Sequence, residues 1–331
     1  MIMEFGNKNI ANRTVQVFFF ILTAFNFSQC TNASQSPTGG LYLPDNFDAV
    51  VVAESTGSAR HITVSDAGDI YVKLRAARPK GIVALRDTDN DGQADIITTF
   101  GDYNDEGNYG TSMRIYKGYL YFSTAFEIYR VKLTPGKLVP ECKVEGIGID
   151  DNRTNNKFEH LAKSIAFDNK GNIYVSFGVA GDVCQKLNRI PGSPGENPCS
   201  QLEKHGGIWK FAANKKGQTQ KDGIRYATGL RSITAMAWNH YDNNLYVVVH
   251  GRDDLHVRNP NLFTSWQSSI LPAEEFLRIK EGANGGWPYY YYDQLKGKRL
   301  LNPEYGGDGV NSGKGKLYET PIMAFPGHWA P

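Results

Sequence analysis

The segment Ile165-Ala-Phe-Asp-Asn-Lys-Gly-Asn-Ile-Tyr-Val175 decides the fold class of this chain. Two apolar, strand-like runs, one ending at Phe167 and one centred on Tyr174, flank a polar turn that contains Gly171. β-Branched and aromatic residues around a Gly or Asn turn are typical of a β-hairpin. The segment therefore predicts two antiparallel strands joined by a tight turn.

The same pattern occurs four times along the chain. Its central tyrosines are spaced by 50, 53 and 72 residues, and another strand-like run follows each hairpin. The hairpins are residues 62–72, 113–122, 165–175 and 236–247, with Tyr71, Tyr121, Tyr174 and Tyr246, and the runs that follow are residues 81–85, 127–131, 207–211 and 275–279. A period of this length with several strands per unit is the signature of β-propeller blades.

No repeat follows the fourth one, and the chain ends in Pro326-Gly-His-Trp-Ala-Pro331. A closed four-bladed ring is one interpretation. An ending in a Pro-rich loop favours the other, a larger propeller of which four to five blades are present and the last repeats lie beyond this chain. We expect the Gly- and Asn-rich stretch 282–316 to be a loop, and we find no helical periodicity of useful length.

Composition agrees with an all-β body. The chain has 331 residues, of which 40% are apolar, and it contains 35 Gly, 18 Tyr and 17 Phe. Glycine-rich turns between aromatic and β-branched strands have this composition. The charge is nearly balanced, with 36 Lys and Arg against 34 Asp and Glu. This balance excludes a protein that binds nucleic acid through bulk positive charge.

The N-terminal segment resembles an export signal. Lys8 and Arg13 precede an apolar stretch, residues 15–27, which is too short for a helix that spans a bilayer. Cys30 follows closely, as in a bacterial lipoprotein signal, although Gln29 before it is unusual for that signal. Lipidation and plain cleavage both remain open, and either places the protein outside the cytoplasm, in the periplasm or secreted. The predicted division is a signal at residues 1–30, a linker at 31–40 and the propeller at 41–331.

The cysteines agree with an oxidising compartment. Cys184 and Cys199 are 15 residues apart in a Gly- and Pro-rich loop, a span that a disulfide can close. The alternative is two free thiols. A zinc site is not indicated, because no CxxC or HxxxH pairing accompanies them. Cys142 has no evident partner in this chain.

The segment Asp87-Thr-Asp-Asn-Asp-Gly-Gln-Ala-Asp95 is a candidate calcium loop. Oxygen ligands at alternate positions with a turn glycine can wrap a hard cation. The twelfth position is Thr98 and not Glu, so the segment is not a full EF-hand loop. A structural Ca²⁺ site and a polar turn without metal both fit. The candidate ligands are Asp87, Asp89, Asp91 and Asp95.

His160 and Arg231 occupy equivalent positions in the repeat. His160 lies seven residues before Phe167, and Arg231 lies seven residues before Trp238. In a propeller, equivalent positions of successive blades meet on one face, where ligands bind. A neutral imidazole beside a guanidinium suits a general base next to an anion site. The alternative is a surface histidine and a structural arginine.

The segment Val249-His-Gly-Arg-Asp-Asp254 directly follows the fourth hairpin. Exposed backbone carbonyls around its turn glycine can bind a cation. The alternative is a charged loop without a ligand.

Several stretches together resemble the glucose/sorbosone dehydrogenases, the soluble sugar dehydrogenases that use pyrroloquinoline quinone (PQQ). The resemblance covers roughly residue 41 to the end and is closest to the sorbosone-type branch. Each motif alone is weak, but their order and spacing are fairly specific. The matching stretches are residues 160–175, 226–238, 245–251 and 285–288, and for the sorbosone-type branch residues 197–202 and 303–309.

The resemblance implies a six-bladed propeller that binds PQQ and Ca²⁺ on its axial face. His160 matches the general base, and Arg231 matches an arginine that binds the cofactor. Gly251 and Arg252 match positions whose backbone carbonyls bind the catalytic Ca²⁺. Glu159 matches an acidic residue on the substrate side.

The chain also departs from the family pattern. The later Lys and Arg residues that clamp the cofactor have no counterpart here. The sequence Val179-Ala-Gly-Asp-Val-Cys184 differs from the glucose-oxidising branch, so substrate preference cannot be transferred.

The sequence therefore predicts an extracytoplasmic PQQ-dependent dehydrogenase that acts on a sugar, a sugar aldehyde or a related alcohol and passes electrons to an external acceptor. It predicts no nucleic-acid partner, and lipidation of Cys30 would tether the protein to a membrane. One alternative is a non-catalytic, secreted carbohydrate-binding propeller. Another is a Ca²⁺-dependent lactonase-type hydrolase on a related propeller.

Overall fold

The structure is a computed structural model, and it divides the chain into two units, residues 1–50 and 51–331. It describes residues 39–75, 81–103, 112–150, 159–161, 163–312 and 318–329. The predicted signal at residues 1–30 lies outside the described residues. The described part of the first unit, residues 39–50, consists of turns and extended backbone. Among the described residues, no helix has both the length and the apolar character needed to cross a membrane.

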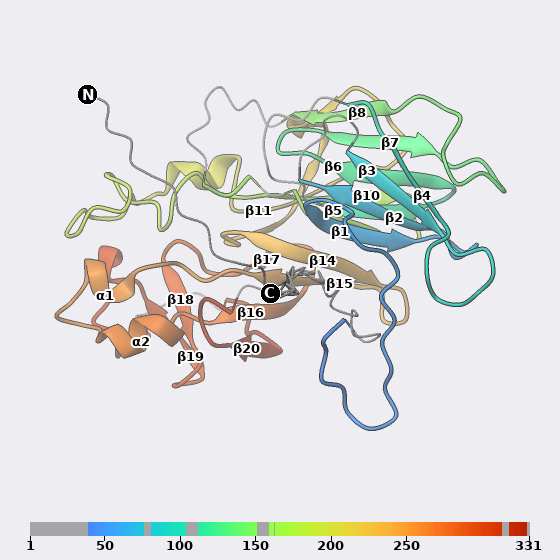
Figure 1. The fold of residues 1–331 in the computed structure, drawn as a ribbon. Helices are drawn as coiled ribbons and strands as arrows, with labels where there is room; N and C mark the ends of the chain where they lie inside the picture. The colour runs from blue at the N-terminus through green and yellow to red at the C-terminus, as the bar shows by residue number, and fades with distance from the viewer. Residues whose placement is uncertain are drawn as a thin grey trace, which may run out of the picture. The chain divides into compact units, whose positions relative to one another are not determined.

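Among the described residues, the second unit contains five sheets, of which four correspond to the four predicted repeats (Figure 1). Sheet 1 consists of β1 (Ala59–Val64), β2 (Ile70–Leu74), β3 (Ile82–Arg86) and β4 (Ile96–Phe100). The four blade strands of sheet 2, which has a fifth strand described below, are β5 (Ser112–Tyr116), β6 (Tyr119–Ser123), β7 (Ile128–Lys132) and β8 (Glu145–Asp150). The four blade strands of sheet 3, which also has a fifth, are β9 (Ile165–Phe167), β10 (Asn172–Phe177), β11 (Gly207–Ala212) and β13 (Ile224–Thr228). Sheet 4 consists of β14 (Ile233–Asn239), β15 (Asn244–Val249), β16 (Glu274–Ile279) and β20 (Met323–Phe325).

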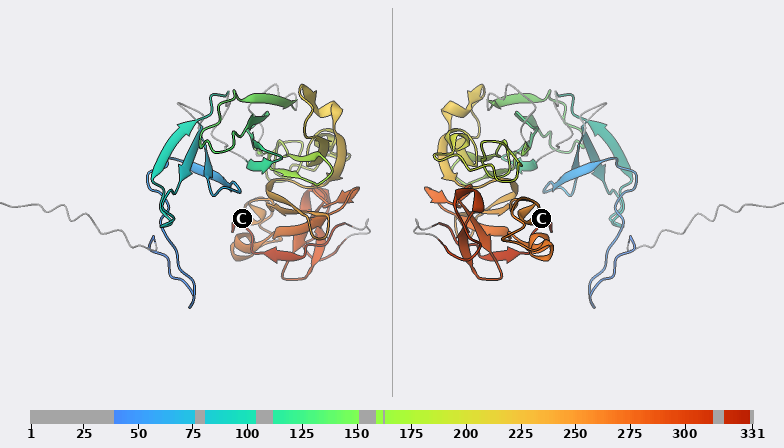
Figure 2. Two further views of the ribbon diagram at one scale, coloured as in Figure 1. Left: turned by 90° about the vertical axis from the view of Figure 1, so that its right-hand side faces the viewer. Right: turned by 90° about the vertical axis from the view of Figure 1, so that its left-hand side faces the viewer.

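The sheets are arranged as successive blades. The first strands of neighbouring sheets lie side by side, β1 beside β5, β5 beside β9 and β9 beside β14. Figure 2 shows these four sheets following one another along an arc. The predicted all-β propeller architecture is confirmed, with four blades in this chain. The six blades implied by the resemblance stay a prediction.

An apolar core fills each interface between neighbouring blades. Side chains of sheets 1 and 2, including Tyr71 and Phe122, form one core. Sheets 2 and 3 form a second core, and sheets 3 and 4 a third. The blade tyrosines reinforce two of these interfaces, because the Tyr71 hydroxyl donates to the Leu138 carbonyl at 3.1 Å and the Tyr121 hydroxyl to the Ala213 carbonyl at 3.2 Å. Burying such aromatic faces is the main source of stability in a repeat architecture.

The hairpin turns explain why the repeat carries Gly or Asn. Lys117 and Gly118 have φ of 47° and 76° between β5 and β6, as in the tight turns that match strand twist. Gly171 in sheet 3 and Asn243 in sheet 4 also have positive φ, 93° and 54°. Glycine and asparagine adopt this backbone region at the lowest cost.

Two short parallel strands tie neighbouring blades together. β12 (Gln218–Thr219), which follows β11 of sheet 3, returns to pair with β8 of sheet 2. β17 (Ala283–Asn284), which follows β16 of sheet 4, returns to pair with β13 of sheet 3.

The expectation of a loop over residues 282–316 is wrong in part. This stretch contains β17 and an antiparallel hairpin of β18 (Tyr290–Asp293) and β19 (Lys298–Leu301), followed by the 3-10 turn Pro303–Tyr305. Tyr291 and Leu300 of the hairpin are buried in a small core with Phe263. β17 has two residues and β18 and β19 have four each, so these strands are too short to show a period-2 pattern among the surrounding glycines and asparagines. Helices are short, namely α1 (Leu255–Arg258) and α2 (Ser265–Ile270).

Candidate functional site

His160 and Arg231 meet through Val179, the second residue after β10. The His160 backbone N–H donates to the Val179 carbonyl at 3.3 Å, and the Val179 N–H donates to the Arg231 carbonyl at 3.2 Å. A Cβ at Gly178 would lie 2.4 Å from the His160 carbonyl oxygen, so glycine is required for this approach. Val179 therefore bridges the segments that lead into sheets 3 and 4.

The Val179 carbonyl also fixes the tautomer of His160. Nδ1 of His160 lies 3.0 Å from this carbonyl oxygen, which only accepts hydrogen bonds, so Nδ1 carries the proton. Nε2 is then the unprotonated nitrogen of the neutral ring. Burial of the ring, and next the charge of Arg231, lower the pKa of His160 from 6.5 to about 4, against the opposing effects of Glu159 and Asp182. His160 is thus a neutral imidazole with a free lone pair at neutral pH.

Arg231 is buried and fully engaged. Its Nη2 donates to Oδ1 of Asp182 at 2.6 Å and to Oδ2 of Asp253 at 3.0 Å. Its Nε donates to the Asp182 carbonyl at 3.1 Å, and its Nη1 donates to the Gly251 carbonyl at 2.5 Å. The Asp253 side chain is 36% exposed, and the Asp182 side chain is completely buried. A ligand could therefore replace Asp253 as a partner of Arg231, whereas replacing Asp182 would leave a buried carboxylate without its partner.

Asp182 is the centre of the charged cluster. Besides Arg231, its carboxylate accepts from Nη1 of Arg258 at 2.5 Å and from the Asp253 backbone N–H at 3.0 Å. Burial alone would raise the pKa of Asp182, but Arg231, Arg252 and Arg258 outweigh it and hold that pKa far below its usual value. A buried carboxylate with several guanidinium partners is costly to disrupt, because each partner removed leaves a charge unpaired.

The side chain of Arg252 is directed into the protein. It is 2% exposed and forms a two-pronged ion pair with Glu304, Nη1 to Oε2 at 2.5 Å and Nη2 to Oε1 at 2.9 Å. Nη1 also donates to Oδ1 of Asn302 at 3.2 Å. This side chain links the loop after β15 to the 3-10 turn Pro303–Tyr305.

Glu159 is held by the long loop between β10 and β11. Nε and Nη2 of Arg189 donate to its two carboxylate oxygens at 2.8 and 2.6 Å, and Nδ2 of Asn188 donates to Oε1 at 2.7 Å. Burial would raise the pKa of Glu159, but Arg189 and Asn188 lower it below its usual value. Both oxygens of Glu159 therefore have partners, and the carboxylate fixes the loop beside His160.

Cys184 and Cys199 are joined by a disulfide that closes this loop, with an S–S distance of 2.01 Å. Both cysteines are buried against Val179 and Trp287. Tyr305 adds hydrogen bonds to the carbonyls of Val183 and Cys184 at 3.1 and 3.2 Å. Of the cysteines in the part of the chain that the structure describes, the third, Cys142, is free and exposed.

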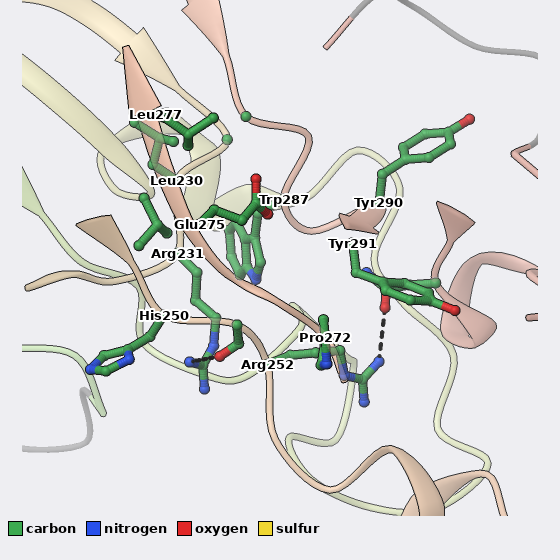
Figure 3. A pocket seen from close by; sticks show the side chains of 15 residues that line it. Leu230, Arg231, His250, Arg252, Pro272, Glu275, Leu277, Trp287, Tyr290 and Tyr291 are labelled. Carbon is green, nitrogen blue, oxygen red and sulfur yellow. Dashed lines mark hydrogen bonds between the residues drawn. The ribbon is translucent and has the colours of Figure 1, made fainter. Parts of the chain in front are cut away.

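A small cavity lies beside Arg231 and Arg252. Figure 3 shows the aliphatic side chains of Leu230 and Leu277 at one end and the two guanidinium groups at the other. Its volume of about 30 Å³ has room for about two water molecules.

The candidate calcium loop connects β3 to β4 in sheet 1, away in sequence from the cluster around Asp182. Carboxylate oxygens of Asp87, Asp89 and Asp95 lie within 4.8 Å of one another. The fourth predicted ligand, Asp91, instead accepts the Gln93 backbone N–H at 2.7 Å. Asp87 accepts the N–H groups of Asn90 and Gly92 at 2.7 and 2.8 Å, which bends the loop around the carboxylates.

The sequence did not single out Asp182, Arg189 or Arg258. Asp182 lies in the segment 179–184, which differs from the glucose-oxidising branch of the resembled family. That difference was the one feature of the sequence that could have drawn attention to Asp182. Its contact with Arg258 joins residues 76 apart. Neither residue type nor spacing indicates that contact without the fold.

Comparisons with known proteins place the fold. No family model matches the chain, and no curated protein matches its sequence. The calcium structure of a family AA12 carbohydrate-active enzyme from Trichoderma reesei has a TM-score of 0.61 at 16% identity, over 84% of this chain and 70% of that one. The holo PQQ domain of pyranose dehydrogenase from Coprinopsis cinerea has a TM-score of 0.62 at 14% identity, over 84% and 67%. At these identities the likeness shows a shared propeller fold.

Proposed function

We propose that this chain is a PQQ-dependent oxidoreductase that oxidises a sugar, a sugar aldehyde or a related alcohol, with His160 as the general base. The observation that carries the proposal is the state of His160. It is a neutral imidazole whose tautomer is fixed by Val179 and whose Nε2 has no hydrogen-bond partner among the described residues, and the charge of Arg231 lowers its pKa. The likeness to the PQQ domain of pyranose dehydrogenase supports the choice of chemistry, since that domain has the same fold.

His160 takes the proton from the hydroxyl that is oxidised. Nε2 accepts it, and the Val179 carbonyl retains its hydrogen bond from Nδ1 throughout, so the ring keeps its orientation. The resulting imidazolium is adjacent to Glu159 and Asp182, which favour the charged ring, and near Arg231, which disfavours it. A low pKa makes His160 a weak but always available base at neutral pH.

Arg231 is the residue that would hold a carboxylate of PQQ. Its guanidinium would exchange the partly exposed Asp253 for the ligand, while Asp182 continues to neutralise part of its charge. Bound PQQ supplies the two-electron acceptor of the reaction.

The position proposed for catalytic Ca²⁺ does not fit the arrangement described. The Gly251 carbonyl already accepts a hydrogen bond from Nη1 of Arg231 at 2.5 Å. A divalent cation on that oxygen would lie against a guanidinium, and like charges at such distances repel strongly. We therefore assign no step of the reaction to a cation at Gly251.

The finer parts of the proposal rest on the sequence resemblance. They are a sorbosone-type substrate, an external electron acceptor and a location outside the cytoplasm, with or without a lipid at Cys30. The disulfide between Cys184 and Cys199 supports an oxidising compartment.

The experiment is reconstitution of the full chain with PQQ and Ca²⁺, followed by dye-linked assays on a panel of aldoses, sugar aldehydes and alcohols. His160→Gln is expected to lower kcat by roughly 10²- to 10⁴-fold, the usual contribution of a general base. PQQ binding, followed by absorbance, is expected to be retained in this variant. His240→Gln is the matched control, because His240 is exposed in the turn between β14 and β15.

Full activity of His160→Gln would remove His160 from the reaction. Saturable PQQ binding without turnover of any substrate on the panel would favour the carbohydrate-binding alternative. Failure to bind PQQ at all would contradict the proposal.

A further inference from the structure

The turn that follows β19 contacts both loops of the candidate site. Its sequence, residues 302–307, is Asn-Pro-Glu-Tyr-Gly-Gly. Gly306 has a φ of 90°, a backbone region that glycine adopts at the lowest cost. A Cβ at Gly307 would collide with the Leu301 carbonyl oxygen, so this position also requires glycine. The two glycines close a compact turn, and we call its residues 302–305 the 302–305 turn.

The first loop that the turn contacts is residues 250–254, after β15. Glu304 holds this loop through the two-pronged ion pair with Arg252, and the two side chains are only 4% and 2% exposed. Asn302 accepts from the same guanidinium at 3.2 Å, and its own Nδ2 donates to the Pro288 carbonyl at 2.8 Å. A carboxylate and an amide that bind one planar guanidinium fix its direction. The turn therefore sets the position of Arg252 and of the backbone that carries it.

The second loop is the long loop between β10 and β11, which the disulfide closes. The Tyr305 hydroxyl donates to the carbonyls of Val183 and Cys184 at 3.1 and 3.2 Å. The Tyr305 ring packs against Gly195, where a Cβ would collide with it, and the Gly195 backbone N–H donates to the Glu304 carbonyl at 2.9 Å. The turn thus contacts both arms of this loop.

The two loops hold the candidate catalytic groups. The loop after β15 provides Asp253 as a partner of Arg231, and the loop after β10 provides Asp182 as another. The loop after β10 also carries Val179, whose carbonyl fixes the tautomer of His160. Among the described residues, no hydrogen bond or ion pair joins the 302–305 turn directly to His160 or Arg231. Any effect of the turn on these two side chains therefore passes through the loops.

We propose that Glu304 and Tyr305 are positioning residues, which fix the two loops and thereby hold His160 and Arg231 in their reactive orientation. The catalytic consequence rests on the proposed function, but the fixing of the loops can be measured in the ligand-free chain. A buried ion pair such as that of Arg252 adds little net stability, because desolvation offsets the attraction between its charges. Its main contribution is the direction that it imposes on the loop.

The first test is hydrogen exchange of the full chain without ligand. Tyr305→Phe removes the hydroxyl that reaches the loop after β10, and we expect exchange in residues 179–184 to accelerate. Glu304→Gln removes the charge that holds the loop after β15, and we expect exchange in residues 250–254 to accelerate. Removing one partner of a buried ion pair can also prevent folding. Tyr305→Phe deletes a single oxygen atom, so it keeps the test decisive if Glu304→Gln does not fold.

Each variant has a matched control in sheet 1. Tyr71→Phe also removes a hydroxyl that donates to a backbone carbonyl, that of Leu138 at 3.1 Å. Asp69→Asn also removes the carboxylate of a two-pronged ion pair, in which Nε and Nη2 of Arg86 donate to its oxygens at 2.6 and 2.8 Å. Both controls are expected to lower the overall stability and to leave exchange in the two loops unchanged.

The second test is the turnover of the reconstituted protein, counted per bound PQQ so that unfolded protein does not contribute. Tyr305→Phe and Glu304→Gln are each expected to lower kcat by about tenfold or more with little change in KM, because a small displacement of a catalytic group such as His160 is costly. Glu304→Asp keeps the carboxylate and is expected to recover part of the loss. The two controls in sheet 1 are expected to match the wild type.

Unchanged exchange of both loops in both variants would overturn the proposal, whether or not the chain is active. So would loosened loops with a full kcat per bound PQQ, because the turn would then be structural only. A wild type that turns over no substrate contradicts the proposed function alone, and the exchange experiment then decides whether the turn fixes the loops.

Discussion

One backbone carbonyl, that of Val179, determines what His160 can do. It accepts both the backbone N–H and Nδ1 of this residue, so ring orientation and tautomer are set together. The spacing of the repeat predicts that His160 and Arg231 enter their blades at the same point, and in the structure the backbones of both contact Val179. The spacing was not sufficient to predict Asp182, because the partners of a buried carboxylate come from segments that only the fold brings into contact.

Arg189 provides a test of how the loop between β10 and β11 is held. Arg189→Ala removes the two-pronged bond to Glu159 and leaves that carboxylate with Asn188 alone. The pair is about one-third exposed, at 33% for Arg189 and 26% for Glu159, so solvent weakens it. We expect the free energy of unfolding to fall by about 1 kcal/mol, and we expect amide exchange in residues 185–195 to accelerate.

Urea unfolding and hydrogen exchange measure these two effects. Lys186→Ala is the control in the same loop, since Lys186 is exposed. Equal stability and exchange in the two variants would show that Arg189 does not hold the loop.

At the scale of elements, the sequence predicted the hairpins, which are local, but it did not predict strand pairing between distant segments. Each predicted hairpin forms two neighbouring strands, because its apolar runs and its turn lie within about a dozen residues. β12 has only two residues and pairs with β8, which precedes it by some 70 positions, as Gln218 opposite Gly148. A segment so short carries no periodicity of its own, and its strand state depends on the edge that it meets.

The loop between β3 and β4 is the candidate Ca²⁺ site, so adding and removing Ca²⁺ tests its role in stability. Carboxylate oxygens of Asp87, Asp89 and Asp95 lie close together, and the pKa values of Asp87 and Asp95 are lowered by hydrogen bonds, first from the Gly92 N–H and the Thr88 hydroxyl respectively. We predict that Ca²⁺ binds here and raises the thermal midpoint. The expected gain is about 2.7 kcal/mol at a free concentration of about 100 Kd.

Differential scanning calorimetry with Ca²⁺ and with chelator measures the shift. Asp87→Asn is expected to abolish it, whereas Asp66→Asn, in the exposed turn between β1 and β2, is expected to preserve it. If the thermal midpoint of the wild type is the same with Ca²⁺ and with chelator, the loop is a polar turn without metal.

At the scale of the whole molecule, stability is shared among blade interfaces, and so is its dependence on pH. His61 in β1 and His160 before β9 lie in different blades, yet both have a pKa lowered from 6.5 to about 4. Burial is the main cause in each. Arg60, Arg114 and Lys73 add to it at His61, and Arg231 adds to it at His160. In the folded protein both imidazoles therefore stay neutral over a pH range in which the unfolded chain binds a proton on each of them.

The sign of the effect follows from linkage. Between pH 6.5 and about 4 the unfolded chain takes up protons that the folded chain refuses, so the free energy of unfolding falls as the pH falls through this range. At about pH 4.5 the loss is expected to reach roughly 2 kcal/mol for each histidine. The carboxylates of the cluster, such as Asp182, have lowered pKa values, and their contribution is lost only at more acidic pH.

Urea unfolding at about pH 7 and about pH 4.5 measures this loss. His160→Gln and His61→Gln are each expected to lose less stability than the wild type between the two conditions, because glutamine binds no proton in either state. The double variant is expected to combine both effects, since sites in separate blades behave nearly additively. His240→Gln, at an exposed turn, is expected to follow the wild type. If all of these proteins lose the same stability, the acid sensitivity does not come from the two buried imidazoles.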